Sequence, residues 1–412
     1  MAYLNTHKIG IRENSLQFSL LVLINLFVGS MVGLERTILP MIGEEQYGIA
    51  STSAALSFIV SFGFSKAIMN LFAGDLADRA GRKRVLLIGW SIGIFVPIIV
   101  IFAHAWWLIV FANVLLGVNQ ALTWSMTVNM KVDLAKSNER GLAVGFNEFA
   151  GYIGVAVMAA ISGFVASTYS LTPEPFYLGI IIVLIGFALS LFTKDTGGHL
   201  KVQSAAEKKS NDEMISFREV FFKTSWKNKN LASSSIAGLT TNLKDGMAWG
   251  LFPIFFAAGG LSVGQIGTVV AVYPAAWGFF QLFTGALSDK VGRRWLIIFG
   301  MTLQSLSLWW IVFMDGFGLW MTGSLFLGIG TAMVYPTIIA SVSDVAHPNW
   351  RATSLGVYRF WRDSGYAFGA LIAGFIADLI SVDWAIGLVG LLPLLAGVNV
   401  MVRMKETLHK DE

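Results

Sequence analysis

Long apolar runs recur along almost the whole chain and constrain its fold more than any other feature. A helix needs about 20 apolar residues to cross the hydrocarbon core of a bilayer, and about twelve runs of that length stand between charged or turn residues. They lie at 17–40, 53–73, 85–103, 106–130, 142–167, 174–193, 230–256, 264–284, 295–313, 318–341, 352–378 and 383–402. Charged residues make up 13% of the chain, against about 25% in soluble domains. The sequence therefore predicts an all-α membrane protein with twelve transmembrane helices.

Basic residues are distributed unequally between the two sets of loops. Of the 29 Lys and Arg residues, 24 fall in the tails or in every second loop, and the alternate loops contain none. Lys and Arg collect on the cytoplasmic side of a membrane. We therefore expect cytoplasmic N- and C-termini and a multi-pass protein of the bacterial inner (plasma) membrane. The formal charge of +4 reflects this loop bias, so we expect no nucleic-acid partner.

One break in composition divides the chain. A segment rich in Lys, Glu and Ser, residues 194–229, separates an N-terminal half, 1–193, from a C-terminal half, 230–412. Apolar residues alternate with charges within this segment, which favours a short helix on the cytoplasmic surface of the membrane. These residues are Ile215, Phe217, Val220, Phe221 and Trp226. The alternative is a solvated linker that happens to contain a few apolar residues.

The two halves match each other at a fixed offset of 211 residues without a gap. Matched pairs include Gly74 with Gly285, Asp78 with Asp289, Gly81 with Gly292, Arg82 with Arg293, Asp133 with Asp344, Arg140 with Arg351, Phe149 with Phe360 and Gly163 with Gly374. Chance does not hold register over some ninety residues. Two parallel six-span repeats are typical of a transporter architecture in which the substrate binds near the midplane, between the halves.

The most specific part of the repeat is a short polar segment that we expect in the loops after helices two and eight. It reads GDLADRAGRKR from Gly74 and GALSDKVGRR from Gly285. Glycine permits close helix approach, aspartate accepts hydrogen bonds from a helix N-terminus or arginine, and the basic cluster suits lipid headgroups. We expect a gating loop made of Gly74, Asp78, Arg79, Gly81 and Arg82, and of Gly285, Asp289, Gly292 and Arg293.

On these motifs the chain resembles the major facilitator superfamily over essentially its whole length. The resemblance implies two pseudo-symmetric six-helix halves and secondary transport by alternating access. The family's proton-coupled drug exporters usually carry an arginine four residues before the glycine of helix four, whereas here Asn113 precedes Gly117. Their Gly-Pro signature in helix five is also missing, because residues 151–164 contain no proline. These departures argue against the ordinary drug-antiporter branch.

Nine charged residues fall inside the predicted spans. A charge at the centre of a bilayer costs a few kcal/mol or more unless it faces a cavity or a partner, so each is a functional candidate. They are Glu35, Arg36, Lys66, Glu148, Lys244, Asp245, Arg359, Arg362 and Asp363. None lies in helices three, six, nine or twelve, which the resemblance implies are the outer helices facing lipid. We therefore expect the nine to surround a central cavity.

The spacing of these charges suggests partners. Arg359, Arg362 and Asp363 share one face of helix eleven with Tyr366. One interpretation pairs Arg359 with Asp363 and leaves Arg362 to bind an anion; the other is a structural network with Glu148, the repeat mate of Arg359, that closes the cytoplasmic gate. Neighbouring residues on a helix point about 100° apart. We therefore expect the adjacent charges 35–36 and 244–245 to find partners elsewhere.

Roles are assigned by residue type. The proton-coupling candidates are Glu35 first, then Asp245, Asp363 and Glu148, because burial can bring a carboxyl group into the range where it loads and releases protons. The substrate-binding candidates are Arg36, Lys66, Asn113, Gln120, Trp124, Lys244, Tyr335, Tyr358, Arg359 and Arg362. The alternative for Glu35 and Arg36 is a purely structural part of an outer gate.

The expected function is secondary active transport, coupled to protons, of a small charged or amphipathic solute. Five bases against four acids in the spans favour an organic or inorganic anion. The first alternative is a proton-driven multidrug exporter of amphipathic cations, and the alternative of another class is a non-transporting receptor. The chain has no cysteine and its five histidines fall in tails or loops, so we expect no metal site, no cofactor and no enzymatic activity. We expect a monomer in lipid.

Overall fold

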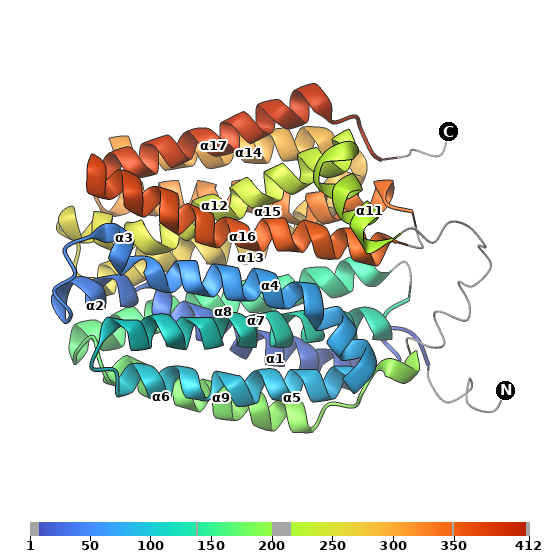
Figure 1. The fold of residues 1–412 in the computed structure, drawn as a ribbon, viewed down its shortest axis with the longest axis horizontal. Coiled ribbons are helices and arrows are strands. Elements are labelled where there is room, and N and C mark those ends of the chain that lie inside the picture. Colours follow the sequence, from blue (N-terminus) through green and yellow to red (C-terminus); the bar gives the residue numbers. More distant parts are fainter. Residues whose placement is uncertain (1–7, 137–138, 200–215, 348–349, 409–412) are drawn as a thin grey trace.

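The computed structural model describes residues 8–136, 139–199, 216–347 and 350–408. They form a bundle of long helices whose axes lie roughly side by side (Figure 1). The part of the chain before the linker forms α1 (Ser15–Arg36), α2 (Leu39–Glu45), α3 (Thr52–Ala55), α4 (Ser57–Ala80), α5 (Arg82–Gly93), α6 (Phe95–Ile101), α7 (Trp106–Leu134), α8 (Arg140–Thr168) and α9 (Glu174–Leu191). Among the described residues there is no β-strand.

The second part repeats this pattern after a short helical segment. That segment consists of α11 (Phe217–Phe222) and a π-helical turn, η3 (Lys223–Lys227). The long helices that follow are α12 (Lys229–Ala258), α13 (Val263–Val291), α14 (Arg293–Phe313), α15 (Phe317–Val345), α16 (Arg351–Leu379) and α17 (Val382–Arg403). Ile215, predicted to belong to the surface helix, lies outside the described residues.

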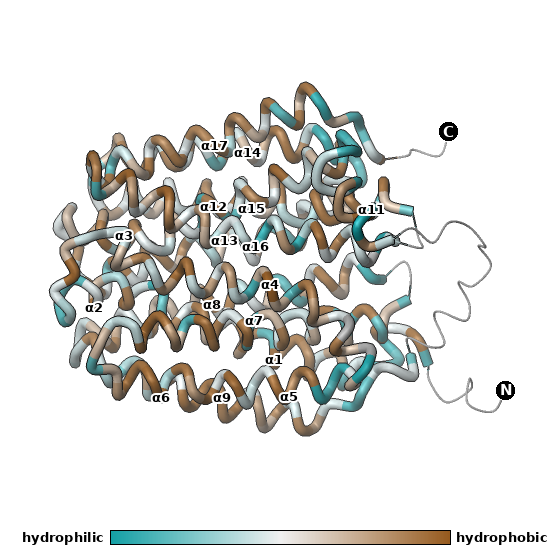
Figure 2. The backbone as a smooth tube through the Cα atoms, in the orientation of Figure 1, coloured by the Kyte–Doolittle hydropathy of each residue, from teal (hydrophilic) through white to brown (hydrophobic). Residues whose placement is uncertain are grey.

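The helices gather into two groups that follow the order of the sequence. In Figure 1, α1 to α9 occupy the lower half of the bundle, and α11 to α17 occupy the upper half. The described chain begins at the lower right of that view and ends at the upper right. We call this side, where α11 also lies, the terminal end, and the other side, with α2 and α3, the opposite end. Hydrophilic residues concentrate at the terminal end, while the middle of the bundle is mostly apolar (Figure 2).

Ten helical segments of the described chain are long and apolar enough to cross a membrane. This makes the chain an integral, multi-pass membrane protein. Two further long helices, α12 and α16, are not among the ten. Both carry charged residues in their middle turns, among them Lys244 and Arg362. The count of twelve spans therefore stays a prediction.

The polar repeat is mostly helical, so our expectation of a loop at this position was wrong, whereas the gating role of these residues stays a prediction. Gly74, Asp78 and Arg79 lie inside α4, and Gly81 alone separates α4 from α5. In the second copy Asp289 lies inside α13, and Gly292 alone precedes α14. Gly81 and Gly292 have φ angles of 92° and 103°, in a region that favours glycine. A single glycine in this conformation thus turns the chain from one long helix into the next.

The two groups of helices approach each other most closely at the opposite end. A Cβ atom added to Gly63 of α4 would lie 2.5 Å from the backbone nitrogen of Ala367 in α16, and one added to Gly163 of α8 would lie 2.9 Å from the Cα of Gly267 in α13. At the terminal end, a Cβ added to Gly74 or Gly285 would meet no atom within 4 Å. The bundle is therefore tightly closed at one end and loosely packed at the other.

Candidate functional site

A polar cavity lies between the two groups of helices. Its lining comes from α4, α7 and α8 on one side and from α15 and α16 on the other. The lining residues are Lys66, Asn70, Gln120, Trp124, Ser125, Val128, Val144, Glu148, Tyr152, Tyr335, Ile339, Arg359 and Arg362. Seven of the predicted site residues are brought together here, but only four of the nine intramembrane charges are among them, so the expectation that all nine surround the cavity was wrong.

Two cations of the cavity have no carboxylate partner. The Lys66 ammonium lies among three aromatic rings, 5.5 Å from the centroid of Phe62, 5.6 Å from that of Trp124 and 5.3 Å from that of Tyr366. Within the described chain, no ion pair or hydrogen bond joins the side chains of Lys66 or Arg359 to another residue. The aromatic faces stabilise the ammonium in part, but the site keeps an uncompensated positive charge.

Glu148 supplies the negative charge of the lining. Its Oε1 atom accepts hydrogen bonds from Trp124 Nε1 at 2.8 Å and from Asn147 Nδ2 at 3.0 Å. The ion pair with Arg359 that one of our interpretations required is not formed. The carboxylate is therefore held in place by neutral donors and stays near the two cations without neutralising either of them directly.

The pairing on α16 differs from the pairing we expected. Arg362 Nε and Nη2 donate to the two carboxylate oxygens of Asp363 at 2.7 and 3.0 Å. Asp363 also accepts hydrogen bonds from Asn70 of α4 at 2.5 Å and from Asn242 of α12 at 3.3 Å. Our pairing of Arg359 with Asp363 was wrong, and Arg359, not Arg362, is the arginine without a carboxylate partner. Asp363 is saturated with donors and joins the two groups of helices.

Lys244 and Asp245 form a second buried pair, away from the cavity lining. Lys244 Nζ lies 2.5 Å from Asp245 Oδ1, and both side chains are fully buried. Tyr273 contacts both members, and Thr331 accepts from Lys244 at 2.9 Å. We expected these adjacent charges not to pair, which was wrong, because long side chains overcome the 100° between neighbouring helical positions. Asp245 Oδ2 has no hydrogen-bond partner among the described residues.

Glu35 and Arg36 lie at the end of α1, outside the cavity. The Arg36 guanidinium is sandwiched between Trp249, 4.1 Å from its ring centroid, and Phe62, at 4.7 Å. None of its three nitrogens makes a hydrogen bond within the described chain, and neither does Glu35 Oε2. Both residues are 1% exposed. As expected, they do not form an ion pair with each other.

The uncharged candidates divide between the cavity and the surrounding core. Gln120 lines the cavity and donates to the backbone oxygen of Val28 at 2.9 Å. Tyr335 lines it with Arg362 stacked over its ring at 5.0 Å. Asn113 is buried within α7, where it donates to the backbone oxygen of Ile109, and Tyr358 is buried with its hydroxyl unpaired within the described chain. These last two are not part of the cavity lining.

Sequence reasoning missed several polar residues of the bundle. Lys131, which we counted among the loop residues, is fully buried in α7 and donates to the backbone oxygen of Leu21 at 3.0 Å. Asn70 connects Asp363 with Ser125, whose hydroxyl donates to Asn70 at 3.0 Å. Lys131 carried no signal because it stands at the polar edge of an apolar run, and an isolated Asn in a helix is not distinctive.

The helices that follow Gly81 and Gly292 begin with the same set of contacts. Arg82 forms an ion pair with Asp133 at 3.4 Å, and Arg293 forms one with Asp344 at 3.2 Å. A further match at the 211-residue offset, KDT at 194–196 with KET at 405–407, was available in the sequence and was missed. Its threonines donate to the same two aspartates, at 2.6 and 3.3 Å.

The acidic residues of these two segments, Asp195 and Glu406, cap the N-termini of α5 and α14. Asp195 accepts from the backbone nitrogen of Lys83 at 3.0 Å, and Glu406 accepts from those of Arg293 and Arg294 at 2.8 and 3.2 Å. Partial burial raises the pKa of Glu406, whereas hydrogen bonds from backbone N–H groups lower it. The hydrogen bonds together have the larger effect, so the pKa of Glu406 lies below its usual value. Both carboxylates thus lie where a helix N-terminus favours negative charge.

A latch connects the two groups of helices at the opposite end. Asp378, near the end of α16, accepts hydrogen bonds from the backbone nitrogens of Thr52 and Ser53 at 2.5 and 3.0 Å. The hydroxyl groups of Ser51 and Ser53 add two more, at 2.9 and 2.5 Å. These four contacts fix the start of α3 to α16 and hold this end closed.

Comparisons with known proteins agree with this architecture. A family model described as Major Facilitator Superfamily matches residues 19–261 and 234–412. Multidrug resistance protein 2 of Bacillus subtilis (strain 168) is 24% identical over 368 residues, 87% of this chain and 88% of that protein. Quinolone resistance protein NorA of Staphylococcus aureus (strain MRSA252) is 26% identical over 134 residues, so the match spans 32% of this chain and 34% of that relative.

Solved structures share the fold at low sequence identity. A crystal structure of the nucleoside transporter NupG superposes with a TM-score of 0.73 and 13% identity, over 94% of this chain and 100% of that one. A bacterial homolog to the human lysosomal transporter Spinster gives a TM-score of 0.74 and 12% identity, over 95% and 97%. Because the family model matches most of the chain, the chain belongs to the major facilitator superfamily.

Proposed function

We propose that the protein moves a small organic or inorganic anion by alternating access and that protons drive this movement. One observation carries the proposal: Lys66 and Arg359 line the cavity without a carboxylate partner, and Glu148 is the acid that shares the lining with them. An uncompensated cation inside a membrane is costly. A bound anion would relieve this cost, and a guanidinium suits carboxylate or phosphate.

Glu148 is the proton carrier that fits this cavity best. It lines the cavity, whereas Asp363 is saturated by Arg362, Asn70 and Asn242 and has little capacity to take up a proton. Glu35, the first candidate from the sequence, becomes the second here; its Oε2 is buried without a partner within the described chain. Protonation of Glu148 would leave Lys66 and Arg359 free to bind an anion, so a proton and an anion would enter the site together.

The moving bodies in this proposal are the halves 1–193 and 230–412, joined by the linker 194–229. The opposite end is held by the Asp378 latch and by close helix contacts, whereas at the terminal end a Cβ atom added to Gly74 or Gly285 would meet no atom within 4 Å. Because Lys and Arg collect on the terminal end, we place it in the cytoplasm of a bacterial inner membrane. The structure then corresponds to a state that faces the cytoplasm, with α12 and α16 as the remaining two of twelve spans.

A second candidate function is export of amphipathic drugs. The names of two relatives, a quinolone resistance protein and a multidrug resistance protein, favour it. The rings of Trp124, Tyr152 and Tyr335 in the cavity lining would suit an aromatic solute. On this alternative, Glu148 would bind the cationic group of the drug and the basic residues would serve the gate.

Proton movement in liposomes tests the two candidates against each other. Purified protein is reconstituted with an entrapped pH-sensitive dye, and benzene dicarboxylates, inorganic phosphate or tetraphenylphosphonium are added outside. Proton movement with an anion, lost in Lys66→Met and in Glu148→Gln but kept in the surface control Lys83→Gln, supports anion transport. Movement with tetraphenylphosphonium alone supports drug export. A solute that stabilises the protein but is not transported and causes no proton movement would contradict both candidate functions and favour a receptor.

A further inference from the structure

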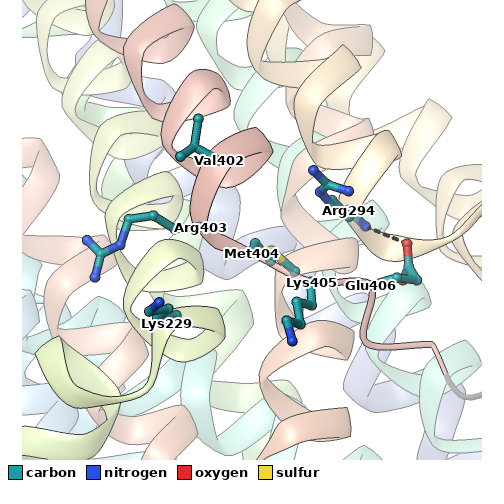
Figure 3. A pocket seen from close by; sticks show the side chains of 7 residues that line it. All are labelled: Lys229, Arg294, Val402, Arg403, Met404, Lys405 and Glu406. Carbon is teal, nitrogen blue, oxygen red and sulfur yellow. Dashed lines mark hydrogen bonds between the residues drawn. The ribbon is translucent and has the colours of Figure 1, made fainter.

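A hollow at the terminal end carries more positive charge than its neighbours compensate (Figure 3). Lys229 begins α12, Arg294 lies in the first turn of α14, and Arg403 ends α17, so three helices meet there. The hollow is lined by Lys229, Arg294, Val402, Arg403, Met404, Lys405 and Glu406. Among the described residues, four cations therefore surround a single carboxylate.

That carboxylate is already engaged. Glu406 Oε1 accepts from the backbone nitrogens of Arg293, Thr407 and Leu408, and Oε2 accepts from that of Arg294. Within the described chain, the side chains of Lys229, Arg403 and Lys405 make no ion pair or hydrogen bond. The N-terminus of α12 adds positive partial charge at the same place and the C-terminus of α17 adds negative partial charge, so the net positive charge comes from the side chains. The hollow thus attracts a further anion.

The internal repeat offers a comparison within the same chain. The residues 211 positions earlier than Arg294 and Lys405 are Lys83 and Lys194, so these two cations occur in both halves. The residues 211 positions earlier than Lys229 and Arg403 are Phe18 and Phe192. The first half forms the same helix junction without charges at these two positions. Lys229 and Arg403 are therefore not required by the fold.

An apolar strip leads along α17 to the hollow. Four side chains at spacings of three or four residues are exposed, and they lie on one face of the helix. They are Leu391 at 39%, Leu395 at 60%, Val398 at 44% and Val402 at 74%. Hydrocarbon covers such a strip in a bilayer, and its end at Val402 and Arg403 marks the level of the lipid headgroups.

We propose that this hollow binds the phosphate headgroup of an acidic glycerophospholipid, with an acyl chain along the α17 strip. Phosphate is the anion present at this depth in every bilayer, and basic pockets between helices on the cytoplasmic side recognise anionic headgroups. Arg403, Lys229 and Lys405 would contact the phosphate, and Figure 3 shows Arg403 and Lys229 on the side of the group away from Glu406, with Lys405 between them and Glu406. The inference does not depend on which solute the protein transports.

Thermal unfolding of the purified full-length protein in detergent tests the inference. Dioleoylphosphatidylglycerol and dioleoylphosphatidylcholine are added at equal mole fraction, and inorganic phosphate is added in a third arm. We expect the anionic phosphatidylglycerol to raise Tm more than the zwitterionic phosphatidylcholine. The double variant Lys229→Gln with Arg403→Gln should lose at least half of that difference. The matched control is Lys83→Gln with Lys194→Gln, the two cations of the equivalent junction, which should keep the difference.

Four results would overturn it. The first is an equal Tm shift with both lipids, and the second is a double variant that keeps the whole difference in Tm shift between them. The third is a control variant that loses as much of this difference as the double variant does. The fourth is a Tm shift with inorganic phosphate as large as the shift with the acidic lipid. The third result would indicate general surface attraction, and the fourth a site for free phosphate. If the double variant does not fold, Arg403→Gln alone is compared with Lys194→Gln, and native mass spectrometry then counts retained phosphatidylglycerol in both proteins.

Discussion

Lys66 and Lys244 are two lysines inside the same bundle with opposite surroundings. Lys66 has aromatic rings around its ammonium and no ion pair within the described chain, whereas Lys244 has Asp245 at 2.5 Å and Thr331 at 2.9 Å. A charge that is buried without a partner destabilises the folded state, while the members of a buried pair depend on each other. The first arrangement suits binding, and the second suits stability.

We therefore expect the same substitution to have opposite effects at the two positions. Lys66→Met removes an uncompensated charge and should raise stability by about 1 kcal/mol or more, at the cost of anion-dependent proton movement. Lys244→Met leaves Asp245 buried and unpaired and should lower stability by about 3 to 5 kcal/mol. Thermal unfolding in one detergent measures both. A lower Tm for Lys66→Met than for the wild type would show that the aromatic cage stabilises its ammonium fully.

At this scale the sequence predicts which residues matter better than which residues pair. Glu148, Arg359 and Arg362 stand out because charges are rare in apolar runs, and the structure brings all three to the cavity lining. The pairs Lys244–Asp245 and Arg362–Asp363 were not predicted. Spacing on a helix gives the direction of each Cα–Cβ bond, but the flexible stems of Lys and Arg decide which carboxylate they reach.

The repeated element of the fold is a junction where one helix ends at a glycine and the next begins under an acid. Gly81 with Asp195 and Gly292 with Glu406 form the two copies. The glycine provides the positive φ, and the acid accepts from the first N–H groups of the new helix, which have no partner within that helix. Each junction therefore joins helices that are consecutive in the sequence to a segment over a hundred residues away.

The acid should contribute to stability as a helix cap. Glu406→Ala should destabilise the protein by about 1 kcal/mol, as loss of a cap typically does. Asp195→Ala is the matched variant and should have a smaller effect, since Asp195 accepts from one N–H group of α5 and Glu406 accepts from two of α14. Thermal unfolding at pH 7 checks the order of the two variants; a larger loss for Asp195→Ala would contradict the capping account.

The same cap makes this contribution dependent on pH. The pKa of Glu406 is lowered in the folded protein, so its stabilising effect is complete above the pKa of an unperturbed glutamate, about 4.3, and is lost as the pH falls through the lower folded value. The difference in Tm between wild type and Glu406→Ala should thus be full at pH 7 and shrink only below about pH 4. A difference that stays constant to pH 3 would mean that the carboxylate charge is not what stabilises α14.

The existence of the helices was predictable from the sequence, but their ends were not. Apolar runs mark the thickness of the hydrocarbon core, and α4 continues beyond the run at 53–73 to Ala80. Polar residues such as Asp78 can extend a helix into the headgroup region, where hydropathy gives no signal. The loop that we expected at the polar repeat is reduced to one glycine for this reason.

In the whole molecule, the two halves are fixed to each other at one end. The Asp378 latch and the contacts of Gly63 and Gly163 hold the opposite end. In the alternating access proposed above this end opens, so the four hydrogen bonds to Asp378 would break in each cycle. Asp378 faces serines and backbone N–H groups rather than a cation, which keeps the latch breakable.

Loss of the latch should shift the population towards a state that is open at this end. The chain has no cysteine, so Glu45→Cys and Asp315→Cys can carry spin labels on either side of it. We expect one short distance in the wild type and an added longer distance in Asp378→Ala, measured by double electron–electron resonance. Asp383→Ala, which removes an exposed acid at the same end, is the control. An unchanged distribution in Asp378→Ala would show that the glycine contacts alone hold the end closed.

The fold of the whole molecule followed from the repeat, whereas its conformation did not. A gapless match at 211 residues required two equivalent halves, and the family model and solved structures confirm the fold. Which end is closed depends on a few contacts between the halves, such as Asp378 with Ser51. Nothing in the local sequence around Asp378 indicates a partner more than three hundred residues away.

The two copies of the repeat also differ at equivalent positions in and beside the cavity. At the equivalent positions of the two copies, Lys66 corresponds to Trp277, Trp124 to Tyr335 and Glu148 to Arg359. A duplicated protein with identical linings would offer a bound solute two poses of equal energy, related by the pseudo-twofold axis. Because the charged positions differ between the copies here, that degeneracy is removed, and a polar solute would be held in one orientation throughout the cycle.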